Sequence, residues 1–309
     1  MRSRVAIVKG TDRRDNIRRA MELVRGDIES KIGGRDIIIK PNCLRPSVSL
    51  SCTHVDALRG ILDFLMSFSP GSVTVAETCE DLEHFESFKR LGYTSLPEEY
   101  DASLSNLEEE GNWMEVSLLN KDYQEVKARL SKTLADCRCR ISAAVAKIHD
   151  TVTMTASWKN MMGALSVRDK VKMHGCNSHR ERVLTREIAI LPQNLVRLAK
   201  LVPPHIGVID GFVGMEGNGP ARGNEKHLGI AIASADFVAA DAVCAKAMGF
   251  EPMEISYLYY GHQVGLSIAD LNDIEVVGAS IQDVQCKFEP HPNYPTQRMW
   301  RELAPALSG

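Results

Sequence analysis

The chain has 309 residues, of which 44% are hydrophobic and 25% are charged, an ordinary balance for a globular protein. Its formal net charge of -3 argues against a general electrostatic grip on nucleic acid. No apolar run approaches the roughly 18 residues that a membrane span requires, and the apolar start of the chain is too short for a signal peptide. We therefore expect a cytoplasmic protein that binds a small-molecule substrate, not nucleic acid or a membrane; the sequence leaves a homo-oligomer open.

Eight cysteines are spread along the chain without a C-x-x-C pair, so the sequence lacks the ligand run of an iron–sulfur cluster. The closest two, Cys137 and Cys139, would share one face of a strand. Reduced structural thiols are the favoured interpretation of this pair, and a redox or metal pair is the alternative.

Short β-rich apolar runs alternate with helical patterns, which predicts an α/β fold whose mostly parallel sheet is flanked by helices. The predicted strands lie at residues 5–8, 36–39, 72–76, 141–146, 206–209, 228–233 and 274–277. The length suits either one large domain or two lobes with the site in the cleft between them. Residues 1–286 are assigned to this catalytic-type unit and 287–309 to a proline-containing arm. A lobe boundary would suit Pro203-Pro204 or the acidic, irregular stretch 97–122, which we expect to be a solvated excursion.

Two helices carry clear local signals. The segment from Thr53 to Asp56 resembles a capping box that opens a helix running through Phe68. Residues 237–248 have helical apolar spacing and are followed by glycine, a typical C-terminal stop. Asp236 and Asp241 flank the start of this second helix, and we interpret both as N-terminal helix charges.

Polar residues follow the second and third predicted strands. Lys40, Asn42 and Arg45 stand in a proline-stiffened loop that can hold a substrate carboxylate or phosphate, because arginine offers a rigid bidentate fork. A proline-rich turn with exposed charges is the plainer alternative. Glu77, after the third strand, suits a general base, a metal ligand or a ribose binder, and equally a cap of the following helix.

Three titratable groups, His149, Lys159 and His174, fall in one short segment after an apolar run. If that run is a buried strand, the segment emerges at the sheet edge where open α/β folds place their ligand sites. The two histidines suit opposed general acid and base roles, and Lys159 suits covalent cofactor attachment, a Schiff base or anion binding. Asp150 and Asn160 are candidate substrate-binding residues beside them. An ordinary strand-to-helix connection with solvated polar residues is the alternative.

A glycine-rich segment follows the fifth predicted strand. Its glycines permit close backbone approach to a ligand or turns with positive φ, yet it lacks both G-x-G-x-x-G and a P-loop ending. Asp210 and Glu216 can bind a cation through oxygen, and Gly217, Asn218 and Gly219 are candidate ligand-binding loop residues. A purely structural loop is an equal alternative.

Together these segments resemble the domain-of-unknown-function 362 family. The matching pieces run in order along the chain: Lys40-Pro41-Asn42, Thr53-His54, Lys147-x-His149-Asp150, Lys159-Asn160-x-Met162-Gly163, His174, Asp210-Gly211, Met215-Glu216-Gly217-Asn218-Gly219-Pro220 and Asp236-x-x-Ala239-x-Asp241. The resemblance adds His54 to the substrate-binding candidates. Some members of the family carry a ferredoxin-like cluster segment, which this sequence lacks.

The chain also resembles, more distantly, the nickel-pincer lactate racemase family, which spaces a histidine, a lysine and a histidine by ten and about fifteen residues. His149, Lys159 and His174 have this spacing. The resemblance implies that the lysine anchors a pincer nucleotide, that the later histidine coordinates nickel, and that the earlier one is an acid/base. Glu77 or His84 stands near the place of that family's second acid/base histidine.

Three functional hypotheses follow. The first is an enzyme of isomerase or racemase type that acts on a small anionic substrate, with His149 transferring the proton, Lys159 and His174 holding substrate or cofactor, and cationic loop residues neutralising the anion. The second is an oxidoreductase component that takes electrons from a separate ferredoxin or flavin. The third is a non-catalytic protein that binds a phosphorylated metabolite. The cofactor is left open between a nickel-pincer nucleotide, another metal and none.

Overall fold

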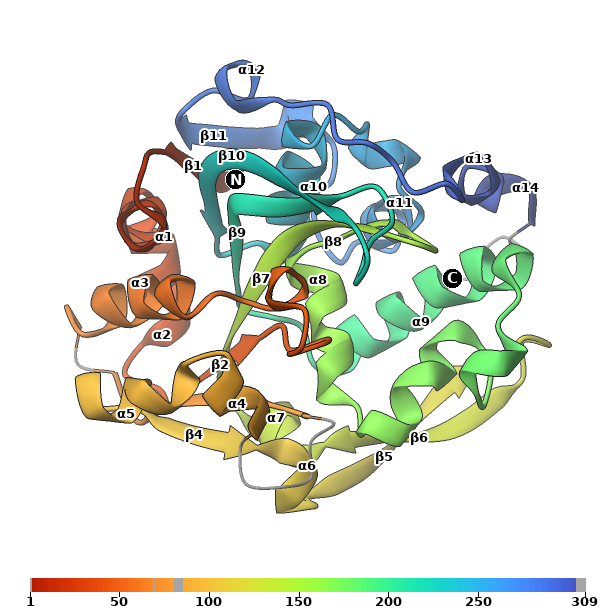
Figure 1. The fold of residues 1–309 in the computed structure, drawn as a ribbon, viewed down its shortest axis with the longest axis horizontal. Helices are drawn as coiled ribbons and strands as arrows, with labels where there is room; N and C mark the ends of the chain where they lie inside the picture. Colours follow the sequence, from red (N-terminus) through yellow and green to blue (C-terminus); the bar gives the residue numbers. More distant parts are fainter. Residues whose placement is uncertain (1, 69, 80–85, 304–309) are drawn as a thin grey trace.

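The computed structural model describes residues 2–68, 70–79 and 86–303, and one sheet of nine strands passes through this part of the chain (Figure 1). The strand order is β11-β1-β10-β9-β7-β2-β3-β4, and β8 pairs with β7. The strands are β1 (Ser3–Lys9), β2 (Ile37–Pro41), β3 (Val73–Glu77), β4 (Ser103–Asn106), β7 (Cys139–His149), β8 (Thr153–Thr155), β9 (Ile206–Glu216), β10 (Asn224–Ser234) and β11 (Ile274–Gly278). All seven strands expected from the sequence are confirmed, and β4 and β8 are additional.

The strands β9, β7, β2, β3 and β4 run parallel to one another. β10 is antiparallel to β9 and to β1, and β11 is parallel to β1. The expected α/β class with a mostly parallel sheet is therefore confirmed. Because the carboxyl ends of parallel strands meet at one edge of a sheet, the loops after β2, β3 and β7 lie together there.

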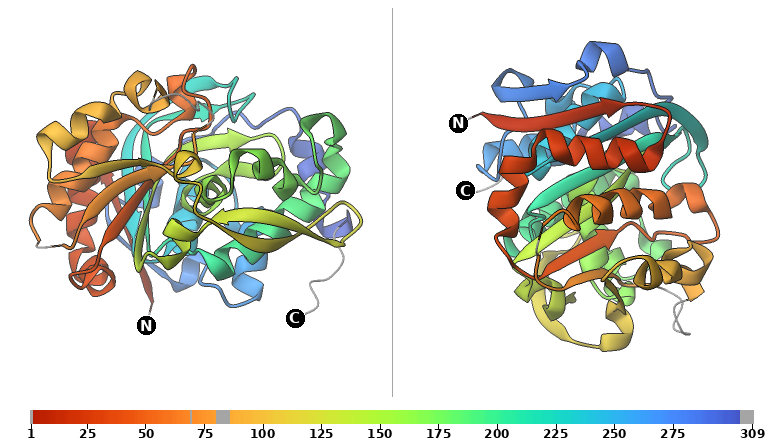
Figure 2. Two further views of the ribbon diagram at one scale, coloured as in Figure 1. Left: turned by 90° about the horizontal axis from the view of Figure 1, so that it is seen from below. Right: turned by 90° about the vertical axis from the view of Figure 1, so that its left-hand side faces the viewer.

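Helices cover both faces of the sheet (Figure 2). One layer consists of α1 (Arg13–Leu23), α2 (Arg25–Ile32) and α3 (Val55–Leu65), and the other of α8 (Ser157–Asn160), α9 (Leu184–Leu201), α10 (Phe237–Ala247) and α11 (Ser256–Gln263). The side chains of β2 alternate between the two layers, since Ile37 and Ile39 pack with the first and Ile38 with the second. Apolar side chains on both faces explain why the central strands appear in the sequence as nearly unbroken apolar runs.

Shorter elements frame this core. They are α4 (Glu86–Arg90), α5 (Leu96–Glu99), α6 (Leu107–Glu110), α7 (Lys132–Asp136), α12 (Ile281–Val284), α13 (Tyr294–Gln297) and α14 (Trp300–Leu303). A separate antiparallel ribbon of β5 (Trp113–Leu119) and β6 (Glu125–Ser131) lies below α9 in Figure 1. In the described part of the chain, no helix has the length and apolar character needed to cross a membrane.

Four local expectations were wrong. The stretch 97–122 is not an irregular excursion, because β4 joins the main sheet and β5 joins the ribbon. His54, rather than Thr53, caps α3, since the Thr53 hydroxyl is occupied with Ala143 O at 2.7 Å, and the helix ends at Leu65. Most of the glycine-rich segment continues β9 to Glu216 and is therefore strand rather than loop. Asp241 lies inside α10, whereas Asp236 is its N-cap as expected.

Candidate active site

A cavity of about 180 Å³, called here the small cavity, lies at the carboxyl edge of β2, β3 and β7. The lysine and arginine side chains along its wall are Lys147, Lys159, Lys170 and Arg182, and the carboxylates are Glu77 and Asp150. With cations in excess over carboxylates, the wall favours an anion. The small cavity also contains His149, His174, Asn42 and Asn160, so the main polar residues singled out in the sequence meet in one place.

The floor of the small cavity contains a buried ion pair. Lys40 Nζ lies 2.5 Å from Glu77 Oε2, and neither side chain is more than 3% exposed. Burial lowers the pKa of Lys40, and the Glu77 carboxylate opposes that change. The pair requires glycine at position 163, because a Cβ there would lie 2.2 Å from Glu77 Oε1 and 2.4 Å from Lys40 Nζ. Lys40 does not line the small cavity itself; it holds Glu77, which does, in place.

Two amides connect this pair to a second buried lysine. Asn160 accepts from Asn42 Nδ2 at 3.0 Å and donates to Lys40 O at 3.0 Å, which ties α8 to β2. Lys147 Nζ donates to Asn42 Oδ1 at 3.0 Å and to Ser51 O at 2.6 Å. Burial lowers the pKa of Lys147 to about 8. The side chains of Asn42 and Asn160 are therefore already engaged in hydrogen bonds that hold the floor of the small cavity together.

Lys159 differs from the other buried lysines because, among the described residues, its ammonium group has no hydrogen-bond or ion-pair partner. It lines the small cavity and is 8% exposed. Burial lowers the pKa of Lys159 to about 7; the Asp150 carboxylate opposes the shift, and Lys147 and Arg182 add to it. At neutral pH a substantial fraction of this amine is uncharged, as a base or nucleophile requires.

Asp241 holds the helix that carries Lys159. The N-cap position of α8 is occupied by alanine, which has no capping group. Asp241 from α10 supplies the missing capping group, since its carboxylate accepts hydrogen bonds from Ser157 N at 2.8 Å and Trp158 N at 3.1 Å. It also accepts from the hydroxyls of Ser157 and Tyr257. Burial raises the pKa of Asp241 to about 7 despite these bonds.

The tautomer of His149 is fixed by the backbone. The amide N–H of Thr151 donates to His149 Nδ1 at 3.0 Å, so this nitrogen is unprotonated and the neutral ring carries its proton on Nε2. Asp150 Oδ1 lies 3.1 Å from the same nitrogen, but the amide hydrogen cannot move, and Asp150 is already paired with Arg182 at 3.0 Å. Burial, with Lys159 and other cations nearby, lowers the pKa of His149 well below its usual range.

His174 has the opposite tautomer. Its Nδ1 lies 2.8 Å from Glu187 Oε2, and the carboxylate is kept ionised by Arg182 at 2.7 Å. A carboxylate only accepts, so His174 Nδ1 carries the proton and Nε2 offers a lone pair. Burial lowers the pKa of His174, and Glu187 opposes the change. The rings of His149 and His174 are nearly parallel, with centroids 6.3 Å apart.

Several contributors to this site were not found from the sequence. Thr155 Oγ1 is buried, lines the small cavity and has no hydrogen-bond partner within the described residues, so a ligand could satisfy it. Gln297 and Asn293, near the end of the chain, donate to His149 O and Asp150 O, both at 2.9 Å. Arg182, which pairs with Asp150 and Glu187, was missed as well, although it lies only eight residues after His174. Asn293 and Gln297 come from a distant segment that no local pattern links to the site.

Other predicted site residues lie elsewhere. Arg45 is exposed and His54 caps α3, and neither lines the small cavity. The expectation that Arg45 joins the histidines and Lys159 in one pocket is therefore not met. Asp210 pairs with Arg13 at 3.0 Å instead, which uses the carboxylate predicted to bind a cation. His84 lies outside the described residues.

The predicted ligand-binding loop around Glu216 has structural contacts. Glu216 pairs with Lys226 at 3.1 Å and accepts from Glu289 N at 2.9 Å. Asn218 Oδ1 lies 2.9 Å from His291 Nε2, so its side chain is held by the C-terminal segment. Gly217 donates from its amide to Glu289 O at 2.7 Å. Gly219 packs so closely on β7 that a Cβ would lie 2.2 Å from Ile148 O.

The small cavity does not fit a resident pincer nucleotide. Its volume of about 180 Å³ is below the roughly 300–1,000 Å³ that encloses drug-sized ligands. In the described residues no group of three or more His, Cys, Asp or Glu side chains is placed to hold a metal ion. We therefore assign no chemical step to such a group, although Lys159 and His174 both face the same space.

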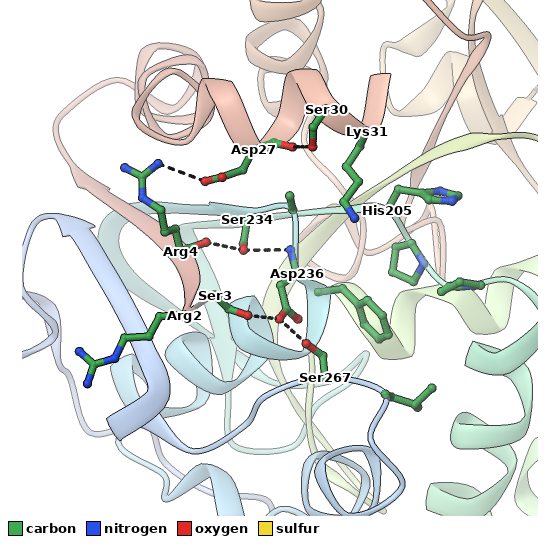
Figure 3. Close-up of a pocket in the computed structure, with 15 residues that line it drawn as sticks. Arg2, Ser3, Arg4, Asp27, Ser30, Lys31, His205, Ser234, Asp236 and Ser267 are labelled. Carbon is green, nitrogen blue, oxygen red and sulfur yellow. Dashed lines mark hydrogen bonds and ion pairs between the residues drawn. The ribbon is translucent and has the colours of Figure 1, made fainter. Parts of the chain in front are cut away.

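A larger cavity of about 430 Å³, called the large cavity, lies at the opposite edge of the sheet (Figure 3). Its polar side chains are mostly bonded to one another. Asp236 accepts from the hydroxyls of Ser3 and Ser267, and Arg4 pairs with Asp27 at 3.1 Å. These bonds leave few groups for chemistry, so the small cavity is the candidate active site.

Residues 37–246 match the family model described as a domain of unknown function, DUF362. The chain belongs to this family. It is 30% identical over 142 residues to a thylakoid-associated protein of Synechocystis sp., which covers 45% of this chain and 41% of that protein. The chain thus spans less than half the length of that relative. The lactate racemase apoprotein of Thermoanaerobacterium thermosaccharolyticum is a solved structure with a TM-score of 0.48 at 14% identity, covering 80% of this chain and 57% of the other.

Proposed function

We propose that this protein is an enzyme that transfers a proton at a carbon atom of a small anionic substrate, in chemistry of isomerase or racemase type. The observation that supports this most is the pair of nearly parallel imidazoles, His149 and His174, which have opposite tautomers and line one small cavity with the unpaired amine of Lys159. Such a set offers both a proton donor and a proton acceptor at neutral pH.

Substrate size and charge follow from the cavity. Its volume of about 180 Å³ is below the roughly 300–1,000 Å³ of sites for drug-sized ligands, which suits a short organic acid. The excess of cationic side chains along the wall favours its carboxylate. Lys159 is the best placed of these to bind it or to act as a base, since the other lysines already donate to protein oxygens.

The two imidazoles can divide the proton transfer between them, with one ring taking a proton from the substrate and the other ring giving one back. His174 Nε2 has a free lone pair and takes the proton from carbon, while Glu187 on the other nitrogen stabilises the cation that forms. His149 Nε2–H donates to the oxygen that gains negative charge or returns the proton to carbon. A buried neutral imidazole suits this second role because its proton is not lost to solvent.

Hydrogen exchange in D₂O tests the proposal. The protein is incubated with a panel of short 2-substituted carboxylic acids, and proton NMR follows the loss of the C–H signal next to the carboxylate. We expect exchange of at least one acid by the wild type, and a rate at least about 100-fold lower for His149→Gln. His227→Gln, at an exposed position in β10, is the matched control and should stay within about twofold.

The outcomes separate the alternatives. If no acid exchanges but several raise the melting temperature, the protein is a binding protein and the proposal is wrong. If a folded His149→Gln protein exchanges as fast as the wild type, His149 is not the proton donor.

A further inference from the structure

Two buried cysteines face each other beside the small cavity. The segments around Cys43 and Cys52 form an isolated antiparallel bridge in which these two residues are partners. Thr53 N donates to Asn42 O at 2.8 Å, which flanks the pair and makes it a non-hydrogen-bonded one. In such a pair the Cα atoms lie about 4.5 Å apart, within the range of roughly 4.4–6.8 Å that a disulfide requires.

The thiols are also in side-chain contact. The thiol of Cys43 interacts with the thiols of both Cys52 and Cys79. Cys43 and Cys52 are both buried, with no more than 6% of either residue exposed. Cys43 nevertheless lines the small cavity. A small oxidant that enters the cavity can therefore reach one sulfur of the pair.

From this geometry we propose that Cys43 and Cys52 are a site of reversible oxidation that forms a disulfide. The proposal goes beyond the proposed function and does not depend on it. Cys52 is favoured over Cys79 as the partner because the bridge aligns the two backbones directly, whereas Cys79 follows a different strand. The bond would close the ten-residue loop 43–52.

The reaction balances with hydrogen peroxide, which is small enough for the cavity. The Cys43 thiolate attacks one peroxide oxygen, the O–O bond breaks, and a sulfenic acid forms while hydroxide leaves. The Cys52 thiolate then attacks the Cys43 sulfur, and the hydroxyl on that sulfur leaves as hydroxide. The two cysteines lose two electrons, the peroxide gains them, and the two thiol protons convert the two hydroxides to water.

The disulfide would act on the floor of the site. Asn42 and Ser51 directly precede the two cysteines, and both hold Lys147 Nζ, at 3.0 and 2.6 Å. A bond between the following residues would fix these two oxygens relative to each other. The interaction with Cys43, together with burial, raises the pKa of Cys52. The interaction with Cys52 lowers the pKa of Cys43, but the interaction with Cys79 and burial outweigh it and raise that pKa. Few thiolates therefore exist at neutral pH, and oxidation should be slow.

Peptide mapping tests the site. Trypsin does not cleave before proline, so Cys43 and Cys52 stay together in peptide 36–59 while Cys79 lies in peptide 60–89. After treatment with dilute hydrogen peroxide at alkaline pH and alkylation of free thiols, we expect peptide 36–59 to carry no alkyl group and to be lighter than the reduced peptide by two hydrogen atoms. The melting temperature should rise by about 5 °C, and dithiothreitol should reverse both changes.

Two variants make the result decisive. Cys79→Ser should still form the bond within peptide 36–59, and Cys52→Ser should not. A link between the two tryptic peptides in the wild type would overturn the pairing. Alkylation of both cysteines after treatment of the wild type, in a protein whose other thiols have reacted, would overturn the proposal altogether.

Discussion

The two cavities at opposite edges of the sheet differ in how far their polar groups are satisfied. The large cavity has more than twice the volume of the small one, about 430 against 180 Å³. Around the large cavity, Asp236 and Arg4 are bonded to neighbours. Around the small cavity, the buried hydroxyl of Thr155 has no hydrogen-bond partner among the described residues. A catalytic site needs polar side chains that are shielded from water and not already bonded to the protein. Buried polar atoms without a hydrogen-bond partner are therefore a better guide to the site than cavity volume.

This difference arises from strand direction. At the carboxyl edge, loops after three parallel strands converge, and their buried polar groups come from β2, β3 and β7. At the other edge β1 begins and β10 ends, and their short side chains Ser3 and Ser234 bond to the nearest backbone or carboxylate. The comparison can be tested with matched substitutions at the two edges.

The largest expected effect separates two aspartates that both cap helices. Asp241→Ala should lower the free energy of unfolding by about 3 kcal/mol, because it strands buried N–H groups of Ser157 and Trp158 where water cannot replace the carboxylate. Asp236→Ala, beside the large cavity, should lower the free energy of unfolding by about 1 kcal/mol, since solvent in that cavity can reach the half-buried cap. Urea denaturation measures both. Equal losses would mean that burial does not distinguish these two aspartates.

A smaller effect concerns pH. The pKa of Lys159 is lowered from 10.5 to about 7 in the folded protein. The folded state therefore binds fewer protons than the unfolded state between about pH 7 and 10.5, so this group favours folding progressively as pH rises through that window. Below pH 7 the burial penalty is present in full. Lys159→Met should consequently be more stable than the wild type at pH 6, by about 2 kcal/mol, and lose that advantage by pH 10.

The matched control is Lys31→Met, at the large cavity. Its stability relative to the wild type should change little between pH 6 and pH 10, as measured by urea denaturation at both values. If Lys159→Met is as pH-independent as this control, Lys159 is not held as a neutral amine.

Much of the fold and part of the site could be predicted from the sequence. The seven main strands were visible because a strand buried on both faces is a run of apolar residues, as in 141–146. His149, Lys159 and His174 were found because they are near one another in the chain. Asp241 was misjudged because its partners, the amides of α8, are 83 and 84 residues away. A carboxylate within the apolar helix α10 was the one available signal.

Arg45 shows the limit of that reasoning and gives the smallest expected effect. Position in the chain places it just after β2, but only the structure shows that its side chain is exposed rather than part of the cavity wall. Arg45→Ala should therefore change the exchange rate in D₂O by less than about twofold, whereas Arg182→Ala, which removes the partner of Asp150 and Glu187, should lower it at least about tenfold. A tenfold loss in Arg45→Ala would mean that the loop closes over bound substrate and that the cavity wall is incomplete without it.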